Sequence, residues 1–417
     1  MKNNTLKNSA KITNSKKLSN FKWRGIGGNG KRVFGQRLAL TKPEIKNILK
    51  QQDIQLISLT QHRISWFTSY NHRMTQQDIT LLTRQVATML CSGIPIVDTF
   101  QLLLNSTKKA ETHSVVALIG FTIESGEGVS RAFEISSSSF SDFYLHIIAS
   151  GEQSGALDQA FQRLADYREQ QDALRQKTTR AMFYPLIIFI TAILVSILML
   201  IFVIPEFKVL FDQFGASLPM LTQYVLNISN YLTQYFFYYL LIIIIVGLAL
   251  VRLYRKSLNF RCYISRFSLQ IPILGAIQSK AAISRFCRTF SIGFQSGLPL
   301  TNNIKMAIDT MNHCHYQDLL SHLPKEISSG LPIHLALKNT HCFSDFMIQM
   351  LTIGEESGTI EQMLDRISAI YKKDIDHIVD NLGTLLEPCI MIILGSIVGL
   401  LVISMYLPIF NLIQVLN

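Results

Sequence analysis

The sequence feature that most constrains the fold is an uncharged run of 25 residues between Arg180 and Glu206. A helix rises about 1.5 Å per residue, so this run is longer than the roughly 30 Å hydrocarbon core of a bilayer. Similar uncharged runs cover residues 235–251 and 389–410. Buried core helices are the alternative, but runs of this length favour membrane spans. We therefore predict three membrane-spanning helices, over residues 181–204, 235–252 and 389–410.

Lys and Arg residues near the span ends predict the orientation, because they concentrate on the cytoplasmic side of a membrane. The connection 205–234 contains only Lys208, and the tail 411–417 contains no basic residue. We therefore expect residues 1–180 and 252–388 in the cytoplasm, and the 205–234 loop and the C-terminus in the periplasm. The basic residues behind this assignment are Arg163, Arg168, Arg175, Lys177, Arg180, Arg252, Arg255, Lys256, Arg261, Arg266, Lys372 and Lys373.

The start of the chain and its cysteines agree with this orientation. Residues 1–20 contain no apolar run of the kind found in a signal peptide, so we expect the head to stay in the cytoplasm. The cysteines form no CxxC pair, and their scatter along a long chain does not resemble a disulfide framework. A reducing compartment is the simplest interpretation for Cys91, Cys262, Cys287, Cys314, Cys342 and Cys389.

Positive charge is concentrated in the head of the chain. The net charge is +11, and residues 1–75 hold 15 Lys and Arg against two acidic residues. This basic head also contains aromatic residues, which suggests nucleic acid, but no helix-turn-helix, zinc finger or aromatic RNA-binding motif accompanies them. An anionic membrane leaflet or an acidic protein explains the charge as well. We favour these two, and expect no nucleic-acid partner for the head and its aromatic residues Trp23, Phe34, Trp66 and Phe67.

The head is predicted to contain a disordered basic tail, residues 1–20, and a small α+β module, residues 21–62. A capping box begins at Thr41 and predicts a helix to about residue 52. Residues 54–59 are predicted to form a closing strand. Two β-like runs flank the turn-rich segment GIGGNGKR that precedes this helix.

The GIGGNGKR segment, residues 25–32, partly fits two phosphate-binding patterns. A P-loop needs a Ser or Thr after its Lys, where this chain has Arg32. Both P-loop and GxGxxG motifs need a long helix that begins at the glycines, whereas the residues that follow here, including Gly35, resemble a strand. Asn29 and Gly30 between two β-like runs predict a hairpin turn, which we favour over phosphate binding.

The two large regions outside the spans, residues 75–180 and 257–387, read alike and predict an internal duplication. SGIP in the first matches SGLP in the second, and GEQSG matches GEESG, in the same order and with one slip of a single residue. Apolar residues recur at helical spacing in each copy, which predicts two helical bundles. Because no strong helix breaker precedes Pro185, we expect the last helix of each bundle to run into the membrane.

The GExSG motifs are the polar motifs of most interest, because they occur in both copies. In one interpretation, Ser154 and Ser357 cap the helices that follow. In the other, the acidic residues Glu152, Glu355 and Glu356 hold a cation or face a basic partner. We favour capping, and interpret SGIP and SGLP as helix–turn–helix corners.

The sequence offers no candidate catalytic residue and no candidate zinc site. The local concentration of His and Cys lacks the short ligand spacings of a zinc site, so we interpret these residues as solvated loop residues. No Gly-x-Ser-x-Gly motif or convincing nucleophile–base pattern is present. We expect no catalytic residue, no cofactor and no enzymatic activity. The His and Cys residues concerned are His313, Cys314, His315, His322, His334, His341 and Cys342.

The ordered motifs SGIP, GEQSG and Tyr184-Pro185, then SGLP, GEESG and Glu387-Pro388, resemble the type II secretion F-domain family. Its members are inner-membrane platform proteins of type IV pilus assembly and type II secretion. The segment after Pro205 is similar to the family's pattern of Phe, Gly, Leu-Pro and Thr. The head is similar to the N-terminal module of pilus-type members. The structural or interaction positions are Gly93, Pro95, Gly151, Glu152, Gly155, Pro185, Gly215, Pro219, Gly297, Pro299, Gly354, Glu355, Gly358, Glu387 and Pro388.

The resemblance implies a mainly α-helical integral membrane protein of the bacterial inner membrane, with two six-helix cytoplasmic bundles. It implies a homo-oligomer that contacts a hexameric assembly or retraction ATPase, pilin or pseudopilin subunits, other inner-membrane assembly proteins and the lipid bilayer. A type II secretion platform is the nearest alternative function. A repeat-based transporter is more distant, because no membrane-embedded charge marks a substrate path.

Overall fold

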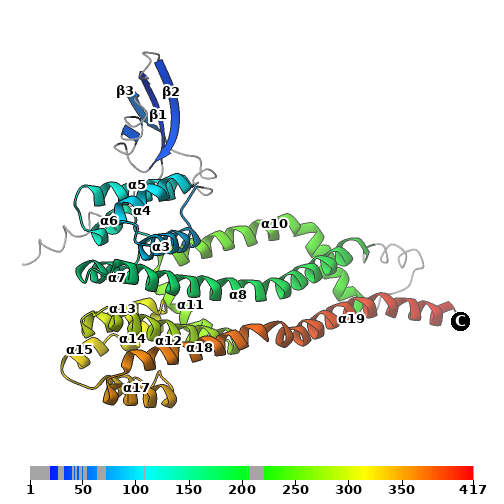
Figure 1. The fold of residues 1–417 in the computed structure, drawn as a ribbon. Coiled ribbons are helices and arrows are strands. Elements are labelled where there is room, and N and C mark those ends of the chain that lie inside the picture. Colours follow the sequence, from blue (N-terminus) through cyan, green and yellow to red (C-terminus); the bar gives the residue numbers. More distant parts are fainter. Residues whose placement is uncertain are drawn as a thin grey trace, which may run out of the picture. The chain divides into compact units, whose positions relative to one another are not determined.

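The computed structural model describes residues 19–26, 32–39, 42, 45–46, 49, 54–62, 72–107, 109–203, 205 and 220–416. These residues are mainly helical, with a small sheet near the N-terminus (Figure 1). They include three helices that are long and apolar enough to cross a membrane, which confirms the predicted fold class. The basic tail up to residue 18, and the motif residues Gly215 and Pro219, lie outside the described residues.

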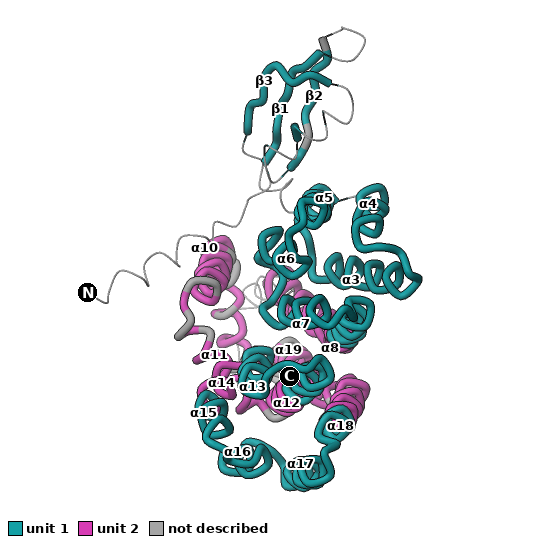
Figure 2. Tube along the Cα trace, turned by 60° about the vertical axis from the view of Figure 1, so that its left-hand side comes forward, with its two compact units in different colours: residues 1–173, 285–310, 321–367 teal, residues 174–284, 311–320, 368–417 magenta. Residues whose placement is uncertain are grey.

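The described chain divides into two compact units (Figure 2). The first unit contains the head and most of both helical bundles. The second contains the membrane-spanning helices, the parts of the bundles that adjoin them in sequence, and residues 311–320 of the second bundle. Unit 1 comprises residues 1–173, 285–310 and 321–367, and unit 2 comprises residues 174–284, 311–320 and 368–417.

The head forms an antiparallel sheet of strands β1 (Ser19–Ile26), β2 (Arg32–Ala39) and β3 (Gln55–His62), in the order β2-β1-β3. The β1–β2 pairing runs from Ser19 opposite Ala39 to Ile26 opposite Arg32, so the two strands form a hairpin. A strand follows the glycines where a phosphate-binding motif needs a helix. The predicted pairing of two β-like runs is therefore confirmed, and the strand β2 stands where the phosphate-binding patterns need a helix. The turn predicted at Asn29 and Gly30 lies outside the described residues.

The head module has a core of its own. Phe21 and Ala39 of the sheet are buried together with Ile45 and Leu49, which are helical. The predicted closing strand is confirmed as β3. The capping box that begins at Thr41 lies largely outside the described residues.

The first repeat contains six described helices, which bury one apolar face each around a common core. Phe133 lies at the centre of this core. The centroid of its ring is 5.9 Å from that of Phe100, 4.9 Å from that of Phe140 and 5.7 Å from that of Phe161. The hydroxyl of buried Tyr144 is 2.9 Å from that of Thr83, so burial leaves this phenol hydrogen-bonded. The helices are α3 (Gln76–Cys91), α4 (Ile96–Ser106), α5 (Ala110–Glu124), α6 (Val129–Ser136), α7 (Asp142–Gln153) and α8 (Leu157–Leu198).

The second repeat follows the same order with one helix divided. Its counterpart of α5 is split into α14 and α15, with Pro324 in the first turn of α15. Proline lacks an N–H group and disfavours helix in the residue before it, so it stops a continuous helix here. The helices are α12 (Pro272–Gln295), α13 (Leu300–Thr310), α14 (Cys314–Leu320), α15 (Leu323–Ser328), α16 (Ile333–Asn339), α17 (Asp345–Ser357) and α18 (Ile360–Asp380).

The last helix of each repeat continues toward a membrane-spanning segment. Helix α8 is one helix of 42 residues that contains Pro185, and a π-helical turn extends it to Val203. In the second repeat, α18 and α19 (Leu382–Leu416) are separated by Asn381 alone, whose backbone N–H still donates to the carbonyl of His377 at 3.2 Å. Nearly continuous helices thus join each bundle to a span.

The segment before the second span differs from the prediction. Helix α10 (Met220–Lys256) begins well before residue 235, so the second half of the predicted 205–234 loop is helical. The reason is tertiary contact within unit 2. Val225 and Leu226 pack against Leu200, and the buried hydroxyl of Thr222 donates to the carbonyl of Ser404 at 2.8 Å.

The cysteines also differ from the prediction. Cys262 of α11 (Leu258–Gln270) forms a disulfide with Cys314, the first residue of α14. Their Cα atoms are 5.2 Å apart, a separation that suits this bond. The bond is absent from the sequence pattern because 52 residues separate the two cysteines, and only the packing of α11 beside α14 brings them together. The expectation of a chain without a disulfide is therefore wrong.

Candidate functional site

The two GExSG motifs lie at equivalent corners of the repeats. GEQSG ends α7 and leads into α8, and GEESG ends α17 and leads into α18. Each motif thus lies where a compact bundle passes the chain to the long helix that leads to a span. We call these two segments, residues 151–155 and 354–358, the rod corners.

The carboxylate of Glu152 caps the N-terminus of a neighbouring helix. Its Oε1 accepts a hydrogen bond from the backbone N–H of Val129 at 2.7 Å, and its Oε2 accepts one from Ser130 at 3.2 Å. These residues begin α6, whose own N-cap residue, Gly128, provides no side-chain cap. The first N–H groups of a helix lack partners within it and attract negative charge, so this carboxylate satisfies both needs.

Glu355 makes the same contact in the second repeat. It accepts from the backbone N–H groups of Ile333 and His334 at the start of α16, at 2.9 and 3.1 Å, and from the His334 ring at 2.6 Å. Burial raises the pKa of Glu355, but the hydrogen bonds from His334 and Ile333 outweigh it, so the pKa lies below its ordinary value.

The first glycine of each rod corner allows the next helix to pass close by. A Cβ atom on Gly151 would overlap that of Ala160 in α8, and one on Gly354 would lie 2.8 Å from Cγ of Met363 in α18. The carbonyls of Gly151 and Gly354 each accept a 2.8 Å hydrogen bond from the N–H five residues later. A larger side chain would push each long helix away from its bundle.

The remaining corner positions reverse the chain. Gly155 and Gly358 both have φ of +71°, a left-handed conformation that glycine adopts without strain. Ser154 and Ser357 donate their hydroxyls back to the carbonyls four residues earlier, at 2.9 and 2.6 Å. The prediction that these serines cap the following helices is therefore wrong, because they end the preceding helices instead.

The SGIP and SGLP segments also reverse the chain at a left-handed glycine. Gly93 and Gly297 have φ of +82° and +70°. Pro95 and Pro299 directly precede α4 and α13, and their carbonyls each accept a 2.9 Å hydrogen bond from the first turn of that helix. A third pair of left-handed glycines, Gly126 and Gly330, precedes α6 and α16 in the same way.

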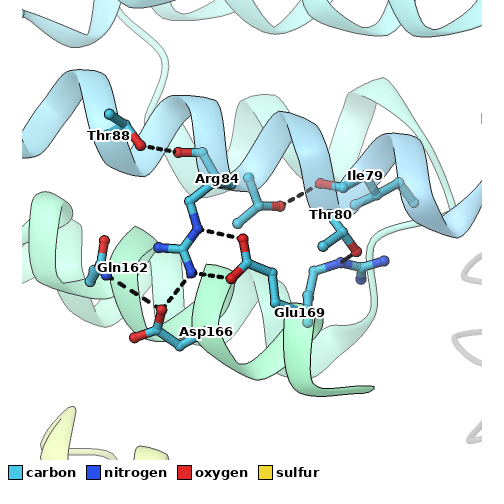
Figure 3. Close-up of polar contacts among 9 residues, drawn as sticks. Ile79, Thr80, Arg84, Thr88, Gln162, Asp166 and Glu169 are labelled. Atoms are coloured by element: carbon cyan, nitrogen blue, oxygen red, sulfur yellow. Dashed lines mark hydrogen bonds and ion pairs between the residues drawn. The ribbon is translucent and has the colours of Figure 1, made fainter. Parts of the chain in front are cut away.

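An arginine ties the first helix of the first repeat to its long helix (Figure 3). The Arg84 guanidinium of α3 donates to Asp166 at 2.5 Å and to both oxygens of Glu169 at 2.6 Å, all on α8. Gln162, one turn earlier on α8, donates to the same Asp166 carboxylate. The hydrogen bonds to Glu169 and Asp166 raise the pKa of Arg84, so its guanidinium is charged at any physiological pH.

The second repeat has an equivalent tie from Arg288. Its guanidinium donates to Asp365 of α18 at 2.6 Å, and the Gln295 amide donates to the other oxygen of that carboxylate at 3.2 Å. In each repeat the long helix is therefore held at its corner by glycine packing and farther along by a charged arginine.

Within unit 2, the parts of α8 and α18 nearest the spans are joined directly. Lys177 of α8 lies 3.0 Å from the Asp376 carboxylate and 2.9 Å from that of Asp380, both on α18. An apolar cluster lies beside this bridge and includes Leu174, Ala181, Ile277, Ala281, Ile375, Val379, Leu382 and Leu386. We call α8 and α18 the rods. These contacts join the two rods to each other shortly before the membrane-spanning segments.

The remaining predicted site residues are exposed or lie inside the long helices. Glu356 and Glu387 are exposed, and Pro185 and Pro388 lie inside α8 and α19. In the described part of the chain, no group of three or more His, Cys, Asp or Glu side chains is placed to hold a metal ion. The carboxylates of Glu152 and Glu355 are already engaged by helix N-termini, which weakens the cation hypothesis for them.

Comparison with known proteins gives the family. A family model described as type II secretion system protein F matches residues 82–205 and again residues 286–408. The chain belongs to the type II secretion system protein F family. The two matches also confirm the duplication, and they cover the rod corners, the Arg84 and Arg288 ties and both rods of this F-family protein.

Individual relatives cover nearly the whole chain. The type IV pilus assembly protein TapC of Aeromonas hydrophila is 35% identical over 95% of this chain and 96% of its own length. PilC of Pseudomonas aeruginosa is 33% identical over 88% of this chain and 98% of its own length. The type II secretion system protein F of Vibrio cholerae is 24% identical over 95% and 98%.

Some structural residues of this F-family protein were not identified from the sequence. The capping role of Glu152 and Glu355 was missed, because their partners lie more than 20 residues earlier. The Lys177 bridge was missed too. Its available signal was the spacing of Asp376 and Asp380, which places two carboxylates on one face of a helix just before a span.

Replacing Gly151 by alanine should destabilise the first bundle by about 1–3 kcal/mol, because the new methyl group would force α8 away from α7. Gly383→Ala is the matched control, since a Cβ at this helical glycine meets open space, and we expect no loss of stability there. Thermal unfolding of the full chain in detergent measures both. Equal midpoints for Gly151→Ala and the unmodified chain would contradict the close-packing role.

Replacing Glu355 by glutamine should lower stability by about 1–2 kcal/mol at pH 7. Because the folded-state pKa of Glu355 is depressed, its contribution is present above the unfolded pKa of about 4.3 and is lost as pH falls through the folded value. The difference between Glu355→Gln and the unmodified chain should therefore shrink below pH 4. Exposed Glu356→Gln is the control, and a pH-independent difference for Glu355→Gln would contradict the cap.

Proposed function

We propose that the chain is an inner-membrane platform protein of a type IV pilus assembly machine. In this role it couples a cytoplasmic hexameric ATPase to the insertion and extraction of pilin subunits, and it performs no catalysis itself. The observation that carries the proposal is helix α8, which runs without a break from the first rod corner into a membrane-spanning segment. The relatives TapC and PilC support the assignment to pilus assembly.

The geometry suits transmission of force. A helix of 42 residues rises about 63 Å in all, so one element extends from the first bundle into a membrane-spanning segment. The rod corner makes the start of this helix follow its bundle, because Glu152, Gly151 and Gly155 fix the turn. The Lys177 bridge makes α8 and α18 move together within unit 2. A stroke on the bundles would thus reach two spans as one movement.

The alternative is a type II secretion platform that drives pseudopilus assembly for protein export. The Vibrio cholerae protein F supports it, but its identity of 24% is well below that of the two pilus assembly relatives. A repeat-based transporter is less well supported, because the duplicated residues build bundles and corners. We therefore favour pilus assembly.

The expected partners follow from this role. They are the assembly or retraction ATPase at the cytoplasmic bundles, pilin or pseudopilin subunits at the spans, other inner-membrane assembly proteins, the lipid bilayer and further copies of this chain. The basic residues near the span ends support a cytoplasmic N-terminus and a periplasmic C-terminus. The basic head would then lie on the side of the ATPase and of the anionic inner leaflet.

The coupling role predicts the effect of reversing the Lys177 charge. Deleting the gene should remove surface pili, and the unmodified chain should restore them. Lys177→Glu should restore few or none, because the new carboxylate would repel Asp376 and Asp380, while the protein still reaches the membrane and captures the ATPase. Sheared surface pilin, membrane abundance and ATPase co-purification measure the three effects.

The control for this variant is Arg175→Glu, an exposed position on the same helix. It should leave piliation normal. Adding Asp376→Lys and Asp380→Lys to Lys177→Glu reverses all three charges and should recover pili. Normal piliation with Lys177→Glu would refute coupling through this bridge, and normal piliation after deletion would refute the proposed function.

Topology reporters test the orientation. Alkaline phosphatase fused after Ser217 or Asn417 should be active, because both sites are expected in the periplasm. Fusion after Ser321 in the second repeat should be inactive, and a cytoplasmic fluorescent protein should show the reverse pattern. An inactive phosphatase at Ser217 together with fluorescence there would overturn the assigned orientation.

A further inference from the structure

Within unit 1, one repeat receives the other on a defined surface. The receiving face belongs to the first repeat and consists of Phe143, Ser150, Arg163 and Tyr167 on α7 and α8. The inserted corner belongs to the second repeat and consists of Thr289, Ile292, Gln295, Ser296, Leu298 and Met306 on α12, α13 and the turn between them. Ile292, Leu298 and Met306 pack into the apolar core of the first repeat.

Polar contacts fix the register of this insertion. Ser150 donates its hydroxyl to the carbonyl of Ser296. The Arg163 guanidinium donates to the carbonyl of Gln295 at 2.9 Å and to the Ser296 hydroxyl at 3.3 Å. Tyr167 hydrogen-bonds to Thr289. The contact therefore combines apolar insertion with hydrogen bonds to the SGLP corner.

The same face exists in the second repeat, but there it is exposed. Counted along the duplication, Phe143, Ser150 and Arg163 correspond to Phe346, Ile353 and Arg366, which all belong to unit 1. Phe346 and Ile353 are 47% and 55% exposed, whereas Phe143 is only 4% exposed. Arg366 is exposed as well. We call these three residues the open face.

The same corner also exists in the first repeat, and its tip is exposed. Ile292, Gln295, Ser296 and Met306 correspond to Thr88, Cys91, Ser92 and Leu102. Leu102 is 50% exposed, whereas Met306 is 7% exposed. Thr88, Cys91 and Ser92 are exposed too. We call these four residues the open corner.

One open face and one open corner on the same unit identify the symmetry of the contact. A two-fold relation between the repeats would cover both faces and both corners at once. Here one of each is used and one of each is left, which is the property of a heterologous, head-to-tail contact. Such a contact repeats from molecule to molecule, and it closes into a ring when the rotation allows.

We propose that the open face binds the open corner of a second copy of this chain. Arg366 then donates to the Cys91 carbonyl and the Ser92 hydroxyl of the other copy, as Arg163 does to Gln295 and Ser296. Leu102 packs against the apolar part of the face, as Met306 does in the first repeat. This interface extends the proposed function without depending on it, since it follows from the duplicated contact alone.

A second copy fits better than an unrelated protein because the arginine is kept. An apolar patch alone would accept many partners. Arg366, however, occupies the position equivalent to Arg163, which donates hydrogen bonds to the SGLP corner. The segment of the chain that matches the SGLP corner is the SGIP corner, residues 92–95, of the first repeat. The chain thus presents both halves of one interface.

Cross-linking of the full chain in membranes tests this. In a Cys342→Ser, Cys389→Ser background, a face chain carries Ile353→Cys with Cys91→Ser, and a corner chain keeps native Cys91. The two are co-expressed with different tags and treated with a short bismaleimide. We expect face-to-corner dimers, with neither face-to-face nor corner-to-corner dimers.

The controls test whether cross-linking depends on the position of the thiol and on the contacts of Arg366 and Leu102. Phe121→Cys in place of Ile353→Cys puts a thiol at a residue that is 56% exposed but off the open face, and it should give no mixed dimer. Arg366→Glu in the face chain, or Leu102→Glu in the corner chain, should lower the yield of mixed dimer at least several-fold. Leu335→Glu, a 40% exposed residue of α16, should not lower it.

Three outcomes would overturn the proposal. The first is the absence of mixed dimers when both chains are present in the membrane at normal abundance. The second is a face-to-face dimer through Ile353→Cys, which would show a two-fold contact. The third is a mixed-dimer yield that Arg366→Glu and Leu102→Glu leave unchanged while the open-face variant loses capture of the ATPase, which would assign the face to that partner.

Discussion

A carboxylate on the N-terminus of a neighbouring helix is the contact on which the corner geometry of each repeat depends. Glu152 and Glu355 each end one helix and cap another, so they fix two elements with one side chain. The glycine just before each glutamate lets the long helix pass close to the same point. Three constraints therefore meet within five residues, and the direction in which each rod leaves its bundle follows from them.

The duplication preserves this corner more faithfully than it preserves the surface. The three pairs of left-handed glycines, the capping glutamates and the arginine ties recur in both repeats. The second repeat differs where Pro324 divides a helix and where His334 adds a donor to Glu355. Its α17–α18 face is open, whereas the equivalent face of the first repeat is filled. The duplication thus leaves one shared scaffold with two different surfaces, one filled and one exposed.

The elements that the sequence predicted are those set by local patterns. The spans, the bundles and the β1–β2 hairpin follow from apolar periodicity and turn chemistry over a few residues. The errors have a tertiary origin. Ser154 and Ser357 have the right residue type for an N-cap, but their hydroxyls find a carbonyl four residues earlier. The Cys262–Cys314 bond and the early start of α10 likewise depend on helices that meet far apart in sequence.

The bridge between the rods divides two tasks between charged and apolar contacts. An exposed ion pair contributes little free energy, so Lys177 with Asp376 and Asp380 selects the register of the two helices rather than holding them by force. The apolar cluster beside it supplies the cohesion, because burial of apolar surface is not directional and tolerates small sliding. The ion pairs therefore set which turns of the two helices face each other, and the apolar cluster keeps the helices in contact at that register. Both contacts are needed for the two rods to move as one body, because apolar burial alone would let one helix slide along the other.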